Sequence, residues 1–238
     1  MELTKDASGN IQNLKENTYP GRGIIIGLDS SGENAIQVYW VMGRSENSRN
    51  RILVQDGDVV KTKAFDESKV ADPSLIIYNA MLTVGDSHIV SNGDQTDTIQ
   101  QFLKDGKTFE DGIKTREFEP DAPNFTPRIS GVINFKTKDF ILSSILKNED
   151  TGEPDHRFFY YKDINSGFGM CVHTYQSDGN PIPSFRSNPY SVLLEGNIDQ
   201  IANFYWGLLN ADNKVAIVVK SINLETNKSS YKIINKLS

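Results

Sequence analysis

The stretch GRGIIIGLDSSGENAIQVYWVMG, residues 21–43, decides the expected fold. Its two ends, GRGIIIGLD and AIQVYWVMG, are rich in the β-branched and aromatic residues that favour strands, and the segment SSGEN between them supplies a turn glycine. The pattern therefore predicts a β-hairpin. The unbroken apolar run from Ile24 to Ile26 indicates a strand that is covered on both faces.

The same strand and turn pattern repeats along the chain. RILVQ and VVKTKAF flank an Asp56-Gly57 turn, and two further strands are predicted from about Leu75 to Val84 and from His88 to Val90. In the second half, strands are predicted in HRFFYYKDI, FGMCVHTYQ, YSVLLEG, VAIVVKSINLE and SSYKIINKL.

Three segments show helical spacing of their apolar residues. DQTDTIQQFLKDGK has Asp94 as a candidate N-cap and Gly106 as a stop, and KTKDFILSSILKNED and NIDQIANFYWGLLN carry one apolar stripe each. The resulting order is hairpins, helix, helix, hairpins, helix, hairpin. This order favours a layered α+β protein over an alternating parallel βα sheet.

Length and composition predict one domain. The chain has 238 residues, 37% of them hydrophobic, which suffices for one large domain or two small ones. Residues 1–18 are polar and without periodicity, and we interpret them as a flexible N-terminal extension, either a loose arm or an added edge segment. Residues 19–238 are expected to form a single domain.

Charge and cysteine content exclude several classes of protein. No window holds the roughly 18 apolar residues that a membrane span needs, and the N-terminus lacks an apolar signal core, so we expect a cytoplasmic protein without membrane contact. The single cysteine, Cys171, forms no internal disulfide and predicts no metal site. A net charge of -6 argues against nucleic acid as a partner.

Two polar stretches are candidates for an anion site. GRSENSRNR, residues 43–51, holds three arginines among Ser and Asn; a solvated turn is the ordinary alternative, but guanidinium forks match phosphate oxygens. In HIVSNGDQTDTI, a glycine turn leads from a strand into a helix whose first amides are free to bind a ligand, although such turns are common.

A third stretch and one residue pair add candidates. TREFEPDAPNFTPRISG, residues 115–131, combines charges with three prolines, which indicates either a preorganised site or a rigid surface loop. Tyr78 and Asn79 interrupt an apolar strand and either bond to the core or face a cleft. The histidines form no recognisable catalytic triad.

Five motifs together resemble the archaeal-type IMP cyclohydrolase family. They are YPGRGIIIG at 19–27, GRSENSRNR at 43–51, YNAM at 78–81, VSNGDQTDTI at 90–99 and FEPDAPNFTPRISG at 118–131. The resemblance implies a four-layer αββα sandwich like that of N-terminal nucleophile hydrolases, with mostly antiparallel sheets. It also implies closure of 5-formamidoimidazole-4-carboxamide ribotide to inosine monophosphate, without a cofactor, a metal or a self-cleaved nucleophile.

The resemblance places Arg51, Tyr78 and Glu119 on catalytic positions. Our hypothesis is that Glu119 takes or relays the proton, Tyr78 donates to the formyl oxygen, and Arg51 stabilises negative charge or orients the reacting pair. Further residues are expected to bind the purine nucleotide, with the first two as phosphate candidates: Arg22, Arg44, Ser45, Asn79, Asn92, Gly93, Asn124, Thr126 and Arg128.

Some features depart from the family pattern and leave alternatives open. The 43–51 loop is rebuilt, and the first 18 residues and the acidic stretch NEDTGEPD are additions that could serve assembly into a homo-oligomer or mark a different substrate. The alternatives are a hydrolase of a cyclic amide or amidine in another nucleotide-like molecule, and a non-catalytic nucleotide-binding protein. The presence of all three catalytic residues weighs against the last.

Overall fold

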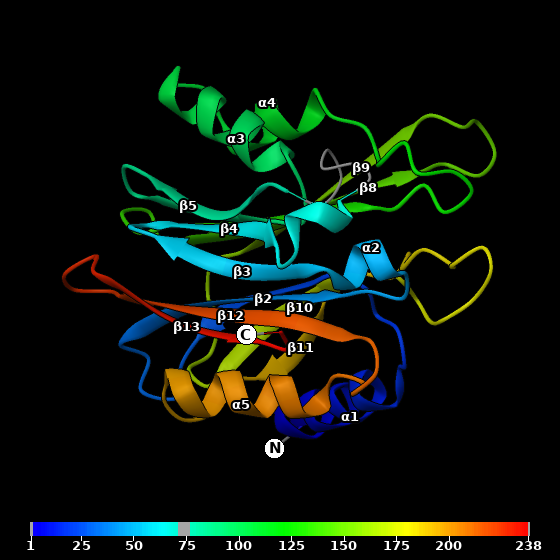
Figure 1. Cartoon of the computed structure of the whole chain (residues 1–238). Helices are drawn as coiled ribbons and strands as arrows, with labels where there is room; N and C mark the ends of the chain where they lie inside the picture. The colour runs from blue at the N-terminus through cyan, green and yellow to red at the C-terminus, as the bar shows by residue number, and fades with distance from the viewer. Residues whose placement is uncertain (1, 71–76, 238) are drawn as a thin grey trace.

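The protein is a layered α/β molecule built on antiparallel sheets. The computed structural model describes residues 2–70 and 77–237, and within them two sheets lie face to face with helices on both outer sides (Figure 1). The expected mixed fold with mostly antiparallel sheets is confirmed. None of the described helices is long and apolar enough to cross a membrane.

The first sheet contains the hairpin predicted from residues 21–43. Its two strands pair antiparallel, with Ile24 opposite Tyr39 and Ile26 opposite Gln37. In spatial order the strands of this sheet are β11 (Tyr190–Leu193), β10 (Phe168–His173), β1 (Gly23–Leu28), β2 (Asn34–Met42), β12 (Lys214–Asn223) and β13 (Ser229–Asn235).

The second sheet contains the strands from the middle of the chain. The strand expected from about Leu75 begins at Asn79, and Leu75 and Ile76 lie outside the described residues. In spatial order the strands are β3 (Arg51–Asp56), β4 (Val59–Ala64), β5 (Asn79–Val84), β6 (Ser87–Ser91), β7 (Arg128–Asn134), β8 (Asp139–Lys147) and β9 (Pro154–Tyr161).

The helix predicted in KTKDFILSSILKNED is wrong, because this segment forms β8. Its apolar residues face both sides: Phe140 and Leu142 lie in the core between the sheets, whereas Ile145 packs towards the outer helices. In a strand covered on both faces, apolar and polar residues no longer alternate. The apolar residues of this segment could therefore be read as one face of a helix. β8 pairs with β7 and β9 along its length, so the ladders decide its conformation.

Helices cover both outer faces (Figure 1). α3 (Gln95–Lys104) and α4 (Phe109–Lys114) lie on the second sheet, and α1 (Glu2–Glu16) and α5 (Ile198–Leu208) lie on the first. The helices predicted for the segments that became α3 and α5 are confirmed. Two short helices, α2 (Glu46–Arg49) and a 3-10 turn (Glu67–Lys69), lie in connections.

The expectation of a loose arm or an edge segment at the N-terminus is also wrong, because Glu2–Glu16 form the helix α1. Ala7, Ile11 and Leu14 are buried on one side of α1, and Ile11 and Leu14 pack into the core beneath the first sheet. The Asn10 side chain donates to the Ser191 carbonyl of β11 at 2.9 Å. The spacing of these apolar residues is helical, but the polar residues around them hid it. The division between residues 1–18 and 19–238 stays a prediction.

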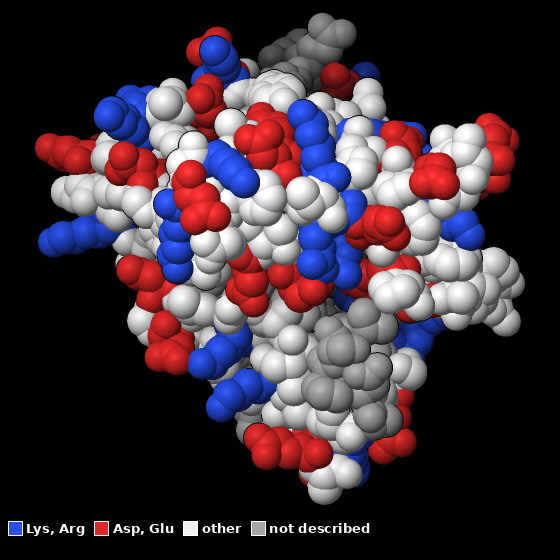
Figure 2. Space-filling model, turned by 90° about the horizontal axis from the view of Figure 1, so that it is seen from above, with Lys and Arg blue, Asp and Glu red and all other residues white. Residues whose placement is uncertain are grey.

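Three apolar cores lie between the layers, and two of them explain why β1 is covered on both faces, as predicted. Ile24 and Ile26 point into the core between the sheets, whereas Ile25 points into the core beneath α1 and α5. On the face seen from above, Lys and Arg are interspersed with Asp and Glu (Figure 2). This face therefore offers no extended basic surface to a nucleic-acid backbone.

Candidate functional site

A cavity of about 300 Å³, called the cleft below, brings together residues that are far apart in the sequence. Its walls come from the segment before β1, the connection between β2 and β3, and the loop after α4. Six of the residues predicted for the site line it: Arg22, Arg44, Ser45, Arg51, Glu119 and Asn124.

The segment YPGR fixes Arg22 at the entrance to β1. Gly21 has φ +75°, and a Cβ atom there would lie 2.2 Å from the Thr174 hydroxyl oxygen. Glycine thus allows both the left-handed backbone and the close approach of the neighbouring strand. The Arg22 amide donates to the Thr174 hydroxyl at 3.1 Å, so the backbone of Arg22 is held against the end of β10.

The three arginines of the 43–51 segment have three different surroundings. Arg44 forms an ion pair with Asp178 at the cleft rim, and its guanidinium lies 5.1 Å from the centre of the Tyr19 ring. Arg49 donates to the Gly43 carbonyl at 3.0 Å and to Asn213 at 3.1 Å, which is a structural role. Arg51 begins β3 with its side chain buried beside the cleft.

The turn of α2 holds Arg51 in place. Ser45 is the N-cap of α2 and accepts from the Ser48 amide at 3.1 Å. The Nε of Arg51 donates to the Ser48 carbonyl at 2.9 Å, so the guanidinium is oriented by its own loop. Ser45 and Ser48 therefore shape the loop, and both also line the cleft.

Two buried guanidinium groups in the cleft have free donors. Arg51 is only 1% exposed, and neither of its terminal nitrogens has a hydrogen-bond partner among the described residues. The buried Nε of Arg22 also lacks a partner there. Burial, together with the charge of Arg22, lowers the pKa of Arg51, yet arginine stays protonated in proteins. A buried cation with open donors is a site prepared for an anion or a polar ligand.

Glu119 supplies a buried carboxylate to the same cleft. It is 2% exposed, and burial raises its pKa, although Arg22 and Arg128 oppose this. Its amide donates to the Thr126 carbonyl at 2.9 Å, and the Asp121 carboxylate accepts from the Thr126 amide at 2.6 Å, which closes the loop. No described residue donates a hydrogen bond to the Glu119 carboxylate, which lines the cleft.

Tyr78 lies in the apolar core between the two sheets. Its hydroxyl lies 2.6 Å from that of Tyr39, and both phenols are buried. The Tyr78 phenol interacts electrostatically with Arg22 and Arg51. Burial and the neighbouring Tyr78 raise the pKa of Tyr39, which therefore keeps its proton. Tyr78 does not itself line the cleft, but its phenol interacts with Arg51, which does.

Other predicted residues lie elsewhere. The Asn79 amide donates to Asp97 of α3 at 2.8 Å, on the opposite side of the sheet from Tyr78. Asn92 donates to the Pro127 carbonyl at 2.9 Å and accepts from the Ile129 amide at 2.8 Å, which ties two loops together. The Thr126 hydroxyl is engaged by Asp121 and Tyr175. None of these three lines the cleft as described.

Arg128 and Gly93 form a layer behind Glu119. Arg128 donates to Gln95 at 2.7 Å and pairs with Asp94 at 2.7 Å. Asp94 is therefore not the side-chain cap expected for α3, because its carboxylate binds Arg128 and Arg116 instead. A Cβ on Gly93 would lie 2.6 Å from Arg128 and 3.5 Å from the Glu119 carboxylate, so glycine leaves room for both.

Sequence reasoning missed the aromatic wall of the cleft. Tyr19 and Tyr175 stack with ring centres 5.7 Å apart and an angle of 18° between the rings. Tyr19 lay inside a recognised motif, but Tyr175 lies beyond residue 131, where no motif pointed to it. Tyr39 was read only as part of a strand.

The chain is similar in sequence to proteins named IMP cyclohydrolase. The sequence profile of the family described as "IMP cyclohydrolase-like protein" matches residues 19–228. A protein of Methanosphaera stadtmanae named IMP cyclohydrolase is 29% identical over 163 residues, which cover 66% of this chain and 74% of that protein.

Two Methanococcus proteins with the same name are also similar. The match to the Methanococcus maripaludis protein is 32% identical and covers 56% of this chain and 65% of that protein. The match to the Methanococcus aeolicus protein is 29% identical and covers 50% and 60%. The matched segments thus span less than two thirds of these two relatives.

Proposed function

Because the chain belongs to the family of IMP cyclohydrolase-like proteins, we propose that its cleft closes 5-formamidoimidazole-4-carboxamide ribotide to inosine monophosphate and water. The observation that carries the proposal is that Arg51 and Glu119 line one cavity, with guanidinium donors left open, and that the buried Tyr78 phenol interacts with Arg51. The αββα order of layers supports relating the fold to N-terminal nucleophile hydrolases. No protein nucleophile is needed, since the attacking nitrogen belongs to the substrate.

The reaction sets three demands on the protein. The carboxamide nitrogen is a weak nucleophile, so it must be held against the formyl carbon and lose one proton as the C–N bond forms. The formyl oxygen gains negative charge and needs a donor. Water then leaves as the C–O bond breaks and the former formamido nitrogen gives up its proton.

Glu119 is suited to accept the first proton. A carboxylate with a raised pKa is a stronger base than an ordinary one, and burial keeps bulk water from competing for it. The opposing charges of Arg22 and Arg128 limit this rise of the pKa. Burial and counter-charges together therefore tune the carboxylate for general base catalysis.

Tyr78 is suited to stabilise the oxygen. A hydroxyl has a single proton, so when Tyr78 donates to the formyl oxygen, its bond with Tyr39 must run from Tyr39 to Tyr78. Tyr39 then supports the donor and orients it. The free terminal nitrogens of Arg51 add positive charge beside the same oxygen.

The phosphate is assigned to the arginines nearer the rim. Arg22 is buried with an open Nε, whereas Arg44 is partly exposed and already paired with Asp178. We therefore favour Arg22 as the buried contact and Arg44 as a contact made at the mouth of the cleft. The stacked Tyr19 and Tyr175 rings offer a wall for the planar or sugar portion of the nucleotide.

An activity assay tests the proposal. The purified protein is mixed with the formamido ribotide, and inosine monophosphate is followed by its ultraviolet absorbance. Closure should exceed the rate in buffer, and Glu119→Gln should lower kcat by roughly 100-fold or more. Glu117→Gln is the matched control, because Glu117 is exposed in the same loop. Closure no faster than in buffer, or equal rates for the two variants, contradicts the proposal.

A further inference from the structure

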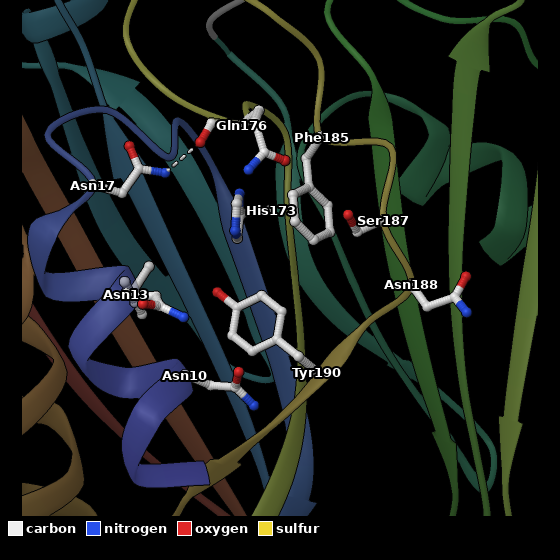
Figure 3. A pocket seen from close by; sticks show the side chains of 10 residues that line it. Asn10, Asn13, Asn17, His173, Gln176, Phe185, Ser187, Asn188 and Tyr190 are labelled. Carbon is white, nitrogen blue, oxygen red and sulfur yellow. Dashed lines mark hydrogen bonds between the residues drawn. The ribbon is translucent and has the colours of Figure 1, made fainter. Parts of the chain in front are cut away.

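A second cavity, of about 310 Å³, lies beside α1 and is called the amide pocket below. Figure 3 shows Asn10 and Asn13 of α1 on one side, Phe185 and Asn188 of the loop before β11 on the other, and the His173 ring between them. Among the described residues, the amide pocket and the cleft have no lining residue in common. Its volume lies at the lower end of the roughly 300–1,000 Å³ typical of small-molecule sites.

The polar groups of the amide pocket are uncharged and several are free. No Lys, Arg, Asp or Glu occurs among the described residues that line it. Asn13, Gln176 and Asn188 are exposed, and their side-chain amides make no hydrogen bond within the described part of the chain, so a ligand would replace only water there. Asparagine and glutamine amides each carry two donors and an acceptor, so the pocket offers paired donor and acceptor groups.

His173 presents an acceptor to this pocket. It is 5% exposed, and its Nδ1 donates to the Tyr175 carbonyl at 2.9 Å. In a neutral ring this leaves Nε2 with a free lone pair, and no described residue donates to it. Burial lowers the pKa of His173 to about 4, which is consistent with the neutral ring.

Aromatic rings form the apolar wall. His173 and Phe185 have ring centres 4.1 Å apart, and Tyr190 lies 5.7 Å from His173 and 6.0 Å from Phe185. Such a cluster offers faces and edges on which a planar heterocycle can stack. Side-chain amides recognise the edges of purines through paired hydrogen bonds. An anionic ligand is disfavoured, because no cation lines the pocket.

We propose that the amide pocket binds an uncharged purine, as the free base or the nucleoside. Its amides and the His173 acceptor read the edge of the heterocycle, and the aromatic wall contacts its face. The site is separate from the cleft, and the proposal stands whether or not the cleft closes a ring. It also gives α1, which lies before the segment matched by the family profile, a function beyond packing.

Calorimetry with inosine and adenosine tests the proposal on the full chain. Wild-type protein should bind at least one of them, and Asn13→Ala combined with Gln176→Ala should weaken binding about 25-fold, since one hydrogen bond is typically worth about fivefold. Gln12→Ala is the matched control, because Gln12 is the neighbouring amide on α1 and does not line the pocket. Unchanged melting temperatures verify that the variants are folded.

Binding should also persist in Arg51→Gln, which alters only the cleft. Three results would overturn the proposal. One is the absence of binding of either nucleoside to the wild type at millimolar concentration. The second is full affinity in the Asn13 and Gln176 double variant. The third is loss of binding in Arg51→Gln, which would assign the nucleoside to the cleft.

Discussion

Replacing Arg51 by Met should make the ligand-free protein more stable. Methionine is unbranched and apolar, so it can fill the space of the arginine stem without carrying a buried charge. The side chain is 1% exposed, and both terminal nitrogens lack partners among the described residues. Proteins retain a destabilising buried charge where a bound ligand pairs with it.

The magnitude follows from the hydrogen bonds. Each unsatisfied buried donor costs about 1–3 kcal/mol, and loss of the bond from Nε to the Ser48 carbonyl costs about 1 kcal/mol. With about 1.5 kcal/mol for each of the two terminal nitrogens, the net gain expected for Arg51→Met is about 2 kcal/mol. In a chain of this length that corresponds to a rise in melting temperature of roughly 4–8 °C.

Urea and thermal unfolding without nucleotide measure the effect, with Arg49→Met as the control. Arg49 lies two residues away, but its donors are satisfied by the Gly43 carbonyl and by Asn213, so its loss should lower stability by about 1–2 kcal/mol. Inosine monophosphate should raise the melting temperature of the wild type and have little effect on Arg51→Met. If Arg51→Met is instead destabilised by more than about 1 kcal/mol, the reasoning about open donors is refuted.

Three further predictions concern Glu119, the tyrosine pair and α1. Burial raises the pKa of Glu119 above 4.5, so the acid limb of kcat/KM should lie above pH 4.5. Since the fold favours the protonated carboxyl, Glu119→Gln should stabilise the protein by an amount that is absent well below pH 4.5 and grows as pH rises through the raised pKa; a constant difference in urea unfolding from pH 4 to 8 would contradict this. Tyr39→Phe should lower kcat about tenfold with little change in KM, because Tyr78 loses the donor that supports it; unchanged kcat would remove Tyr39 from the account. Leu14→Ala should cost about 2–4 kcal/mol of unfolding free energy and Leu3→Ala, at an exposed position of α1, less than about 0.5 kcal/mol; equal effects would show that α1 does not pack as described.

The strands that the sequence predicted correctly are those with clear turns. The β1–β2 hairpin and the Asp56-Gly57 turn have local signals, in which strand formers flank residues that favour tight turns. The prediction for β8 was wrong because the strand is buried on both faces. Such burial depends on the tertiary structure, and it removes the alternation of apolar and polar residues that marks a strand. The prediction for the segment of α1 was wrong because its apolar residues are few. Their helical spacing becomes recognisable only when the sheet that covers them is known.

The candidate site was predictable as a set of motifs but not as a geometry. Arg51 and Glu119 could be selected from the motifs because the proposed chemistry needs a cation and a carboxylate. Which arginine of residues 43–51 is buried, however, depends on the turn of α2. Tyr78 and Asn79 are adjacent in the sequence, and successive residues of an extended chain point to opposite faces. Only one member of that pair could therefore lie on the side of Tyr39, and the other meets Asp97.

A crystal structure of the protein with inosine monophosphate bound tests the central claim most directly. The account predicts the heterocycle in the cleft, within hydrogen-bond distance of the Glu119 carboxylate and the terminal nitrogens of Arg51, and the phosphate towards Arg22 or Arg44. A nucleotide bound outside the cleft, with the Arg51 donors and the Glu119 carboxylate untouched, would contradict it.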